Sequence, residues 1–202
     1  EPFFLYCPWT PPHAAYQIPE DEPAWKIYKD KPWGKDAKVA AAMDTMMDRQ
    51  VGEITALLKK LGIYENTLMF FTSDNGAAKR FDGIHNSCGV MQGHKRSLNE
   101  GGIRVPMVVR WPGKIKLGTE SNQPWYFPDV MPTLAEIAGV SKEVPKDIDG
   151  ISVLPTLLGK GEQKQHEYMY WQFGVRAARS GKWKGIGKGG HMYLYDLSKD
   201  IA

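Results

Sequence analysis

Residues 68–76, Leu-Met-Phe-Phe-Thr-Ser-Asp-Asn-Gly, place oxygen-bearing side chains directly after an apolar run. The apolar run predicts a buried strand, which ends in Asp74, Asn75 and Gly76. In open α/β sheets, ligands bind outside the carboxyl ends of the strands. A carboxylate from Asp74 and an amide oxygen from Asn75 suit a hard cation such as Ca²⁺ or Mg²⁺. Because Asn-Gly is also typical of hairpin turns, the same residues are compatible with a turn that has no ligand.

A second candidate segment closes the long polar loop over residues 77–100. Here His94, Lys95 and Arg96 follow one another, and Gly101 and Gly102 come shortly afterwards. Consecutive cationic side chains bind anions, and glycines let another segment approach the backbone closely. The pattern therefore indicates an anion-binding loop, with a solvated basic turn as the alternative.

A third candidate is His13, which follows the apolar run over residues 2–7 and a group of prolines. The run predicts a strand, and the prolines end it because they lack a backbone N–H. His13 is compatible with a functional role or with a loop histidine bonded to the backbone. Residues 14–35 predict a surface loop. Aromatic residues in and before it could stack on sugar rings or pack the loop onto the body: Trp9, Tyr16, Trp25, Tyr28 and Trp33.

The elements that must position these residues follow from the spacing of the apolar side chains. A helix is predicted over residues 36–61, because apolar residues recur every three or four positions. Together with strands predicted at 2–7 and 68–72, this helix would form a βαβ crossover. Later in the chain we predict a strand at 105–111, a helix at 127–138 and a short helix or turn at 151–158. Short strands at 168–173, 175–179, 183–186 and 192–196 predict an antiparallel sheet.

The expected fold class is therefore α/β, with a mostly parallel central sheet flanked by helices and a small C-terminal antiparallel sheet. We place part of an α/β domain at residues 1–160 and the start of a small C-terminal antiparallel subdomain at residues 161–202.

Composition excludes several classes of function. The 202 residues are 42% hydrophobic with a net charge of +3, which is ordinary for a soluble globular protein and too little for a nucleic-acid footprint. The basic residues around Lys182 and Lys184 predict a solvated hairpin. No apolar run is long enough to span a membrane. Cys7 and Cys88 are the only cysteines, so no disulfide framework is implied, although the two could pair.

Taken in order, these segments resemble the type I sulfatases of the alkaline-phosphatase superfamily. The matching patterns are the strand running into Pro-His at residues 3–13, Glu-Asn-Thr-Leu-Met-Phe-Phe-Thr-Ser-Asp-Asn-Gly at 65–76, and the C-terminal strands. The most distinctive is residues 93–106, where Lys95 is followed five residues later by Glu100-Gly-Gly and then by Arg104-Val-Pro.

The resemblance implies a role for each matching residue. Asp74 and Asn75 would be ligands of a divalent cation, usually Ca²⁺ in this family. Lys95 would contact the sulfate oxygens, and His13 would lie at the sulfate and the leaving-group oxygen. Glu100 and Arg104 would brace the loop. The implied substrates are sulfated small molecules or glycans, and the implied location is a periplasmic, secreted or lysosomal-type compartment.

The sequence also departs from the family pattern. Sulfatases use a formylglycine made from Cys or Ser in a Cys-x-Pro-x-Arg type motif, and neither Cys7 nor Cys88 lies in one. The family's paired aspartates also have no counterpart. We therefore expect a C-terminal portion of a sulfatase whose formylglycine lies upstream, inactive alone and prone to self-association. The alternatives are a phosphoester or phosphonate hydrolase of the same superfamily and a non-catalytic protein that binds sulfated glycans.

Overall fold

The chain divides into two units, which we describe one at a time. The computed structural model describes residues 1–201. The first unit comprises Glu1–Tyr64 and Phe81–Asn86, and the second comprises Glu65–Arg80 and the residues from Ser87 onward.

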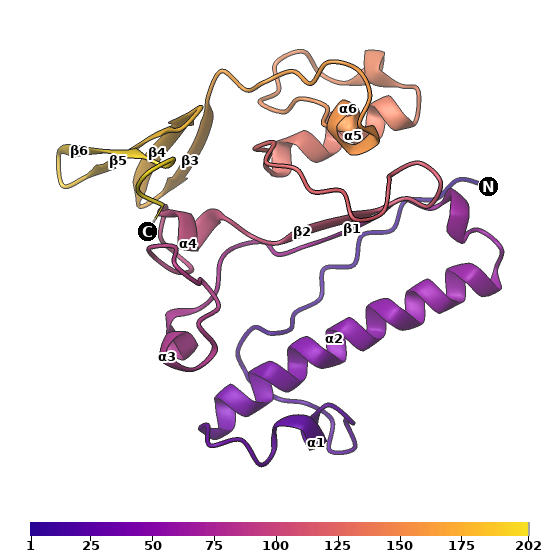
Figure 1. The fold of residues 1–202 in the computed structure, drawn as a ribbon, viewed down its shortest axis with the longest axis vertical. Coiled ribbons are helices and arrows are strands. Elements are labelled where there is room, and N and C mark those ends of the chain that lie inside the picture. The colour runs from indigo at the N-terminus through magenta and orange to yellow at the C-terminus, as the bar shows by residue number, and fades with distance from the viewer. Residues whose placement is uncertain (202) are drawn as a thin grey trace. The chain divides into compact units, whose positions relative to one another are not determined.

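The first unit is built on the long helix α2, Lys35–Lys60, close to the predicted 36–61 (Figure 1). Its buried face includes Val39 and Met43, as the apolar spacing predicts. The short helix α1, Trp25–Tyr28, packs beside it, with the Tyr28 hydroxyl 2.8 Å from the Thr45 hydroxyl. Gly62 takes a left-handed φ of 71° just past the end of α2. Helix α3, Asp82–His85, completes the unit.

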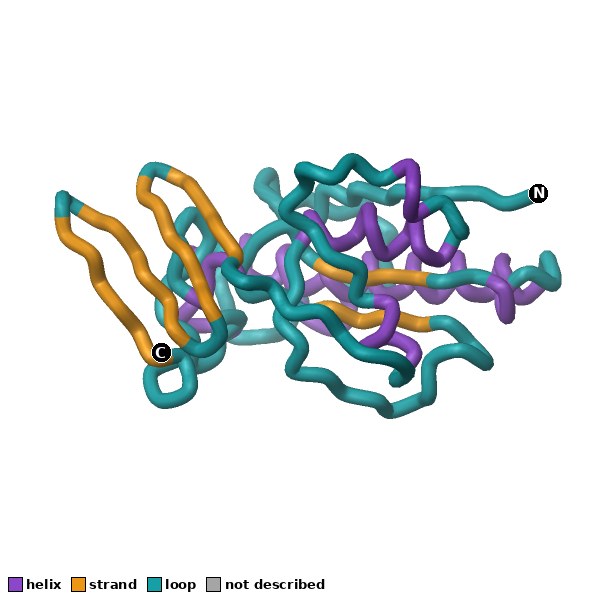
Figure 2. Tube along the Cα trace, turned by 90° about the horizontal axis from the view of Figure 1, so that it is seen from above, coloured by secondary structure: helices purple, strands orange, loops and turns teal. Residues whose placement is uncertain are grey.

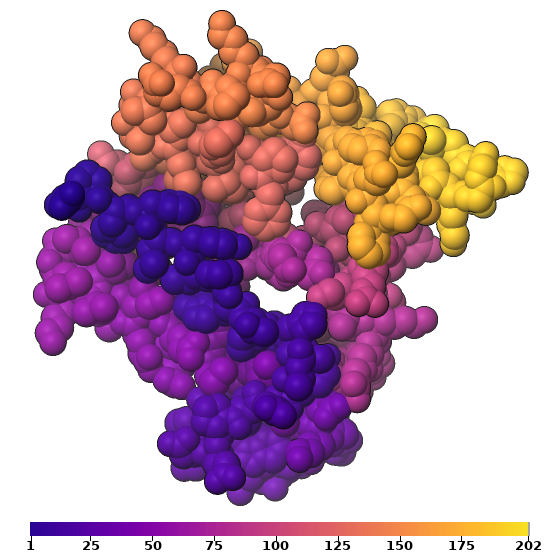
Figure 3. Space-filling model, turned by 180° about the vertical axis from the view of Figure 1, so that it is seen from behind, coloured from indigo at the N-terminus to yellow at the C-terminus, as the bar shows by residue number. Residues whose placement is uncertain are grey.

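Residues 2–7 are not a strand, so this prediction is wrong and the expected crossover does not form in the described chain. Their apolar side chains are exposed, Phe4 by 76% and Tyr6 by 75%. An extended segment becomes a strand only when a neighbour accepts and donates its backbone hydrogen bonds, and no strand among residues 1–201 pairs with this one. Figure 3 shows these N-terminal residues, in indigo, uncovered on the surface of that view.

The second unit begins with β1, Met69–Thr72, which pairs with β2, Met107–Arg110. The two strands are antiparallel, with Phe70 opposite Val109. Within the described residues, β1 and β2 are the part of the expected central sheet that forms. They pair antiparallel, whereas we predicted a mostly parallel sheet. Mixed sheets commonly carry such an antiparallel strand.

Helical segments follow β2 in the second unit. They are α5, Val130–Ile137, and α6, Leu154–Leu158, together with the short 3-10 helices Phe127–Asp129 and Ser141–Glu143. Asp129 is fully buried, and its carboxylate accepts hydrogen bonds from the Tyr126 and Ile151 backbone N–H groups at 2.9 and 2.8 Å. The same carboxylate lies 2.9 Å from His166 Nε2, so one side chain ties α5 to the chain before α6 and to the chain before β3.

The C-terminal sheet confirms the predicted antiparallel hairpins. Its strands run in the order β3, Met169–Phe173; β4, Val175–Ser180; β5, Trp183–Lys188; and β6, His191–Asp196 (Figure 2). Ala177 and Ile186 are opposite each other in the register, and both are buried in a cluster with Leu98. Among residues 1–201, no helix has both the length and the apolar character needed to cross a bilayer.

Candidate functional site

Asp74 and Asn75 lie together just after β1, as the sequence predicts for a strand that ends in polar residues. The Asn75 side-chain amide donates to Asp74 Oδ1 at 2.7 Å, so the two side chains are in direct contact. The Ser73 hydroxyl donates to the Asn75 carbonyl oxygen at 3.0 Å and shapes the turn. Asp74 is exposed.

Three glycines bring this segment against the loop over residues 93–102. The Gly76 N–H donates to the Gly102 carbonyl oxygen at 2.9 Å, and a Cβ on Gly76 would overlap the Gly101 carbonyl. A Cβ on Gly101 would overlap the Gly93 carbonyl, and a Cβ on Gly102 would overlap those of Ser97 and His94. The backbones therefore touch at places where any larger residue would separate them.

Short helix α4, Glu100–Ile103, begins at the Glu-Gly-Gly of the loop. Lys95 lies in the turn that precedes it. The Lys95 N–H donates to the Ala77 carbonyl oxygen at 2.8 Å, and the Ser97 N–H closes the turn on the His94 carbonyl at 2.9 Å. The first of these bonds places the Lys95 backbone beside the segment that carries Asp74 and Asn75. Two of the three predicted elements of the site are therefore neighbours in the fold.

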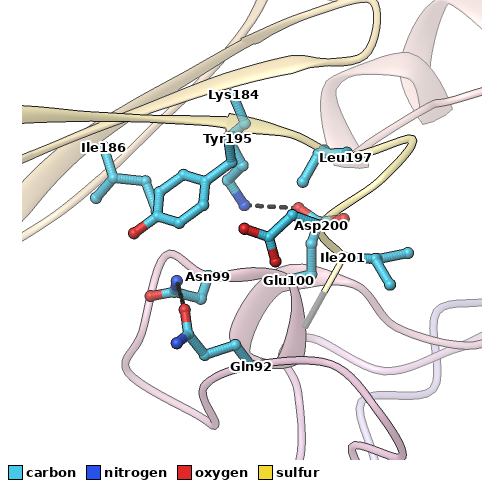
Figure 4. Close-up of a pocket in the computed structure, with 9 residues that line it drawn as sticks. All are labelled: Gln92, Asn99, Glu100, Lys184, Ile186, Tyr195, Leu197, Asp200 and Ile201. Carbon is cyan, nitrogen blue, oxygen red and sulfur yellow. Dashed lines mark hydrogen bonds and ion pairs between the residues drawn. The ribbon is translucent and has the colours of Figure 1, made fainter.

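The loop is anchored to the C-terminal sheet by a buried ion pair (Figure 4). Lys184 Nζ lies 2.6 Å from Glu100 Oε1, and the two residues are 1% and 5% exposed. Arg179 Nη1 lies 4.0 Å from the other carboxylate oxygen. Burial lowers the pKa of Lys184 below its ordinary 10.5, and the hydrogen bond to Glu100 acts in the opposite direction.

This pair corrects two predictions. The side-chain partner of Glu100 is Lys184, and Arg104, which we expected to brace the loop with it, is exposed. The prediction that the basic residues around Lys184 form a solvated hairpin is wrong for Lys184 and holds for Lys182, which pairs with Asp196 at the surface. The burial of Lys184 could have been predicted from the alternation of a strand, because residues two apart share a face and Lys184 is two residues before the buried Ile186.

An apolar contact reinforces the same junction. Leu98, one turn before α4, is 6% exposed and forms a buried cluster with Ala177 and Ile186. Trp171 and Tyr195 pack against this cluster. Leu98 packs on the C-terminal sheet and Glu100 bonds to it, so two contacts hold the loop that carries Lys95 against the sheet.

His13 belongs to the first unit, where it occupies an exposed turn closed by its own N–H on the Thr10 carbonyl at 3.0 Å. Its Nδ1 lies 2.7 Å from the Ala14 carbonyl oxygen. The aromatic residues near it pack within the unit: Tyr16 on Phe81, with ring centroids 5.0 Å apart, and Tyr28 on Trp33 at 6.2 Å. For these rings, the structure supports packing of the loop over stacking on sugar rings.

The donors at the end of β1 fit a hard cation in type, since a carboxylate and an amide oxygen are ligands that Ca²⁺ takes. They are too few to complete a shell, because Ca²⁺ takes six to eight oxygen ligands. Among residues 1–201, no group of three or more His, Cys, Asp and Glu side chains could hold a metal. Any cation bound at Asp74 and Asn75 therefore needs ligands from elsewhere.

Comparison with known proteins places this geometry in context. The family model described as Sulfatase matches residues 1–140. Rat steryl-sulfatase is 42% identical over 132 residues, covering 61% of this chain and 22% of the relative. The Escherichia coli K12 protein described as uncharacterized sulfatase YdeN is 35% identical over 176 residues, covering 85% of this chain and 30% of the relative. The chain thus spans less than a third of the length of these relatives.

Solved structures agree with the sequence matches. The crystal structure of Ps i-CgsB in complex with k-i-k-neocarrahexaose superposes with a TM-score of 0.78 and 29% identity, over 95% of this chain and 42% of that one. The structure of BT4656 in complex with its substrate D-glucosamine-2-N,6-O-disulfate gives a TM-score of 0.63 and 26% identity, over 87% and 38%. The likeness confirms the expected sulfatase-type α/β fold, of which this chain forms a part.

Proposed function

This chain belongs to the sulfatase family, and from that membership we propose that it binds a sulfate ester at the junction of β1 and the loop over residues 93–102. The reaction it would serve is hydrolysis of a sulfate monoester of a sugar or an aryl alcohol. The single observation that carries the proposal is the backbone bond from Lys95 to Ala77, because it brings an ammonium-bearing turn beside the oxygen donors of Asp74 and Asn75.

Each side chain has a physical role in this proposal. Lys95 would bind the sulfate oxygens, and a fixed positive charge stabilises the negative charge that grows on them during cleavage. His13 would keep the role that the family resemblance implies, which is to supply a proton to a leaving-group oxygen, a step suited to imidazole near neutral pH. Asp74 and Asn75 would hold a divalent cation, Ca²⁺ by family resemblance, which supplies further charge stabilisation when bound.

The nucleophile would be the formylglycine of sulfatases, expected from a part of the catalytic domain outside these 202 residues. Neither cysteine of the chain lies in a Cys-x-Pro-x-Arg type motif. We therefore infer that the chain alone binds a sulfate ester and does not turn it over. The substrate class is supported by the neighbours, one solved with a neocarrahexaose and one with a disulfated glucosamine.

Calorimetric titration of the purified chain with 4-nitrophenyl sulfate, with Ca²⁺ and with chelator, tests the binding. Lys95→Ala should weaken binding about 10-fold or more, because hydrogen bonds to charged groups contribute about 1.5–3 kcal/mol. Lys114→Ala is the matched control, since it removes an exposed lysine from another turn of the same unit. Asp74→Ala should abolish the dependence on Ca²⁺.

Two results would contradict the proposal. One is equal affinity of the wild type and Lys95→Ala for 4-nitrophenyl sulfate, which would show that Lys95 does not bind the sulfate. The other concerns turnover: release of 4-nitrophenol by the chain alone would show that it holds a nucleophile of its own.

A further inference from the structure

Arg96, next to Lys95, has a backbone conformation that arginine disfavours. Its φ is +76°, in the left-handed region, and it occupies the third position of the turn that Ser97 closes on His94. Glycine is the usual residue at such a turn position, because a Cβ there is strained. Among residues 1–201, Asn86 is the only other non-glycine residue with a positive φ, and asparagine tolerates that region.

The turn cannot relax to relieve this strain. The carbonyls of His94 and Ser97 lie against Gly102, and the Ser97 hydroxyl lies 2.9 Å from Asn99 Oδ1. The Lys95 N–H is bonded to Ala77 on the other side. Strained residues that packing holds in place are concentrated at functional sites.

Among residues 1–201, no side-chain contact of Arg96 compensates for the strain. In the described chain the Arg96 side chain makes no hydrogen bond or ion pair, and it is exposed. Arg49, in contrast, pairs with Glu22 and Glu53, and Arg179 donates to the Gly181 carbonyl. The only acidic residue of the loop is Glu100, whose carboxylate is bonded to Lys184. Lys95 and Arg96 are therefore adjacent cations that no acidic residue of their loop neutralises.

We propose that Arg96 is a specificity-determining residue that binds a second anionic group on the substrate whose sulfate ester Lys95 binds. The inference rests on the proposed function, and it narrows the substrate class to glycans that carry a second sulfate or a carboxylate near the ester. Lys95 and Arg96 are consecutive, with Cα atoms about 3.8 Å apart, so both side chains start within the same turn. A guanidinium binds sulfate or carboxylate oxygens in pairs, which gives direction as well as charge.

The test compares three ligands by calorimetric titration of the full 202-residue chain. They are glucosamine 6-sulfate, glucosamine 2-N,6-O-disulfate, and a 6-sulfated disaccharide with a uronic acid, so that the last two separate a second sulfate from a carboxylate. The variant is Arg96→Gly, because glycine fits the turn and removes only the side chain. Arg96→Lys retains the charge, and Lys114→Ala controls for the loss of one positive charge elsewhere.

We expect Arg96→Gly to weaken binding of at least one doubly anionic ligand about 10-fold and to change glucosamine 6-sulfate by less than 2-fold. Arg96→Lys should retain part of the preference, and Lys114→Ala all of it. The melting temperature of Arg96→Gly should equal or exceed that of the wild type, which separates a binding effect from unfolding.

Equal losses for all three ligands, or no loss for any, would overturn the role of Arg96. If Lys95→Ala still weakens binding of glucosamine 6-sulfate in that case, the proposed function stands and only the inference fails. If Lys95→Ala has no effect on any ligand, the proposed function fails and the inference fails with it.

Discussion

Lys184 Nζ lies 2.6 Å from the carboxylate of Glu100, 84 residues earlier in the chain, and both side chains are buried. Glu100 opens the helix after the Lys95 loop, and Lys184 lies in the middle of the C-terminal sheet. A residue of the small sheet therefore fixes the position of the candidate anion-binding loop.

Removing one partner of this pair should destabilise the second unit strongly. Lys184→Met leaves the Glu100 carboxylate buried without its cation, and breaking a buried pair costs about 3–5 kcal/mol. Urea unfolding followed by tryptophan fluorescence measures the loss. Lys182→Met is the control, because that lysine pairs with Asp196 at the surface, where an ion pair contributes about 0–1 kcal/mol. Equal losses in the two variants would contradict the assignment.

The same lysine should give the chain a stability that rises with pH in the alkaline range. Burial lowers the folded-state pKa of Lys184 below 10.5, whereas the unfolded lysine keeps its ordinary value. Between the two values the unfolded state binds more protons, so stability rises with pH. The free energy of unfolding measured across this window should rise more steeply in the wild type than in Lys184→Met. Parallel curves would show that Lys184 keeps an ordinary pKa.

The glycine contacts predict opposite effects for the same substitution at two places. Gly102→Ala should destabilise the chain by several kcal/mol, because its Cβ would overlap two carbonyls of the Lys95 turn. Gly52→Ala should stabilise it by about 0.5–1 kcal/mol, because Gly52 lies inside α2 with open space around it. Thermal unfolding of the two variants measures both. Tolerance of alanine at residue 102 would show that the close contact is not required.

The exposed N-terminal segment should make the chain self-associate. Phe3, Phe4, Leu5 and Tyr6 are 58–76% exposed, and contiguous apolar surface of this kind drives association. Light scattering after size exclusion should show a mass that increases with concentration. Phe4→Ser with Leu5→Ser should reduce this dependence, and Leu117→Ser, which removes an exposed leucine from a loop, should not. A monomeric mass at all concentrations would contradict the prediction.

Elements whose pattern is local were predicted well from the sequence. The stripe of α2, the polar end of β1 and the alternation of the C-terminal strands depend on residues a few positions apart. Residues 2–7 were wrongly predicted as a strand because a strand is defined by a partner. The partner of Glu100 was also missed, because Arg104 is close in sequence whereas Lys184 is close only after folding.

The candidate site also has parts that the sequence predicts and a part that it does not. Asp74, Asn75 and Lys95 could be chosen from residue type and spacing, and the bond from Lys95 to Ala77 brings their segments together. The strain at Arg96 could not be predicted, because no feature of the sequence Lys-Arg-Ser indicates which residue takes a positive φ. That conformation belongs to a turn whose carbonyls lie against Gly102 only after folding.

The glycines Gly76, Gly101 and Gly102 and the nearby Lys95 belong to the same sequence pattern, but they serve different purposes. The glycines are required by the close approach of backbone to backbone, whereas the anion binding that we propose depends on the Lys95 side chain beside them. A relative that keeps these glycines and has lost the lysine would retain the architecture without the charge. In a sequence survey, the glycines would therefore identify members of the fold, and under the proposed function the lysine would identify which of those members can bind the sulfate ester.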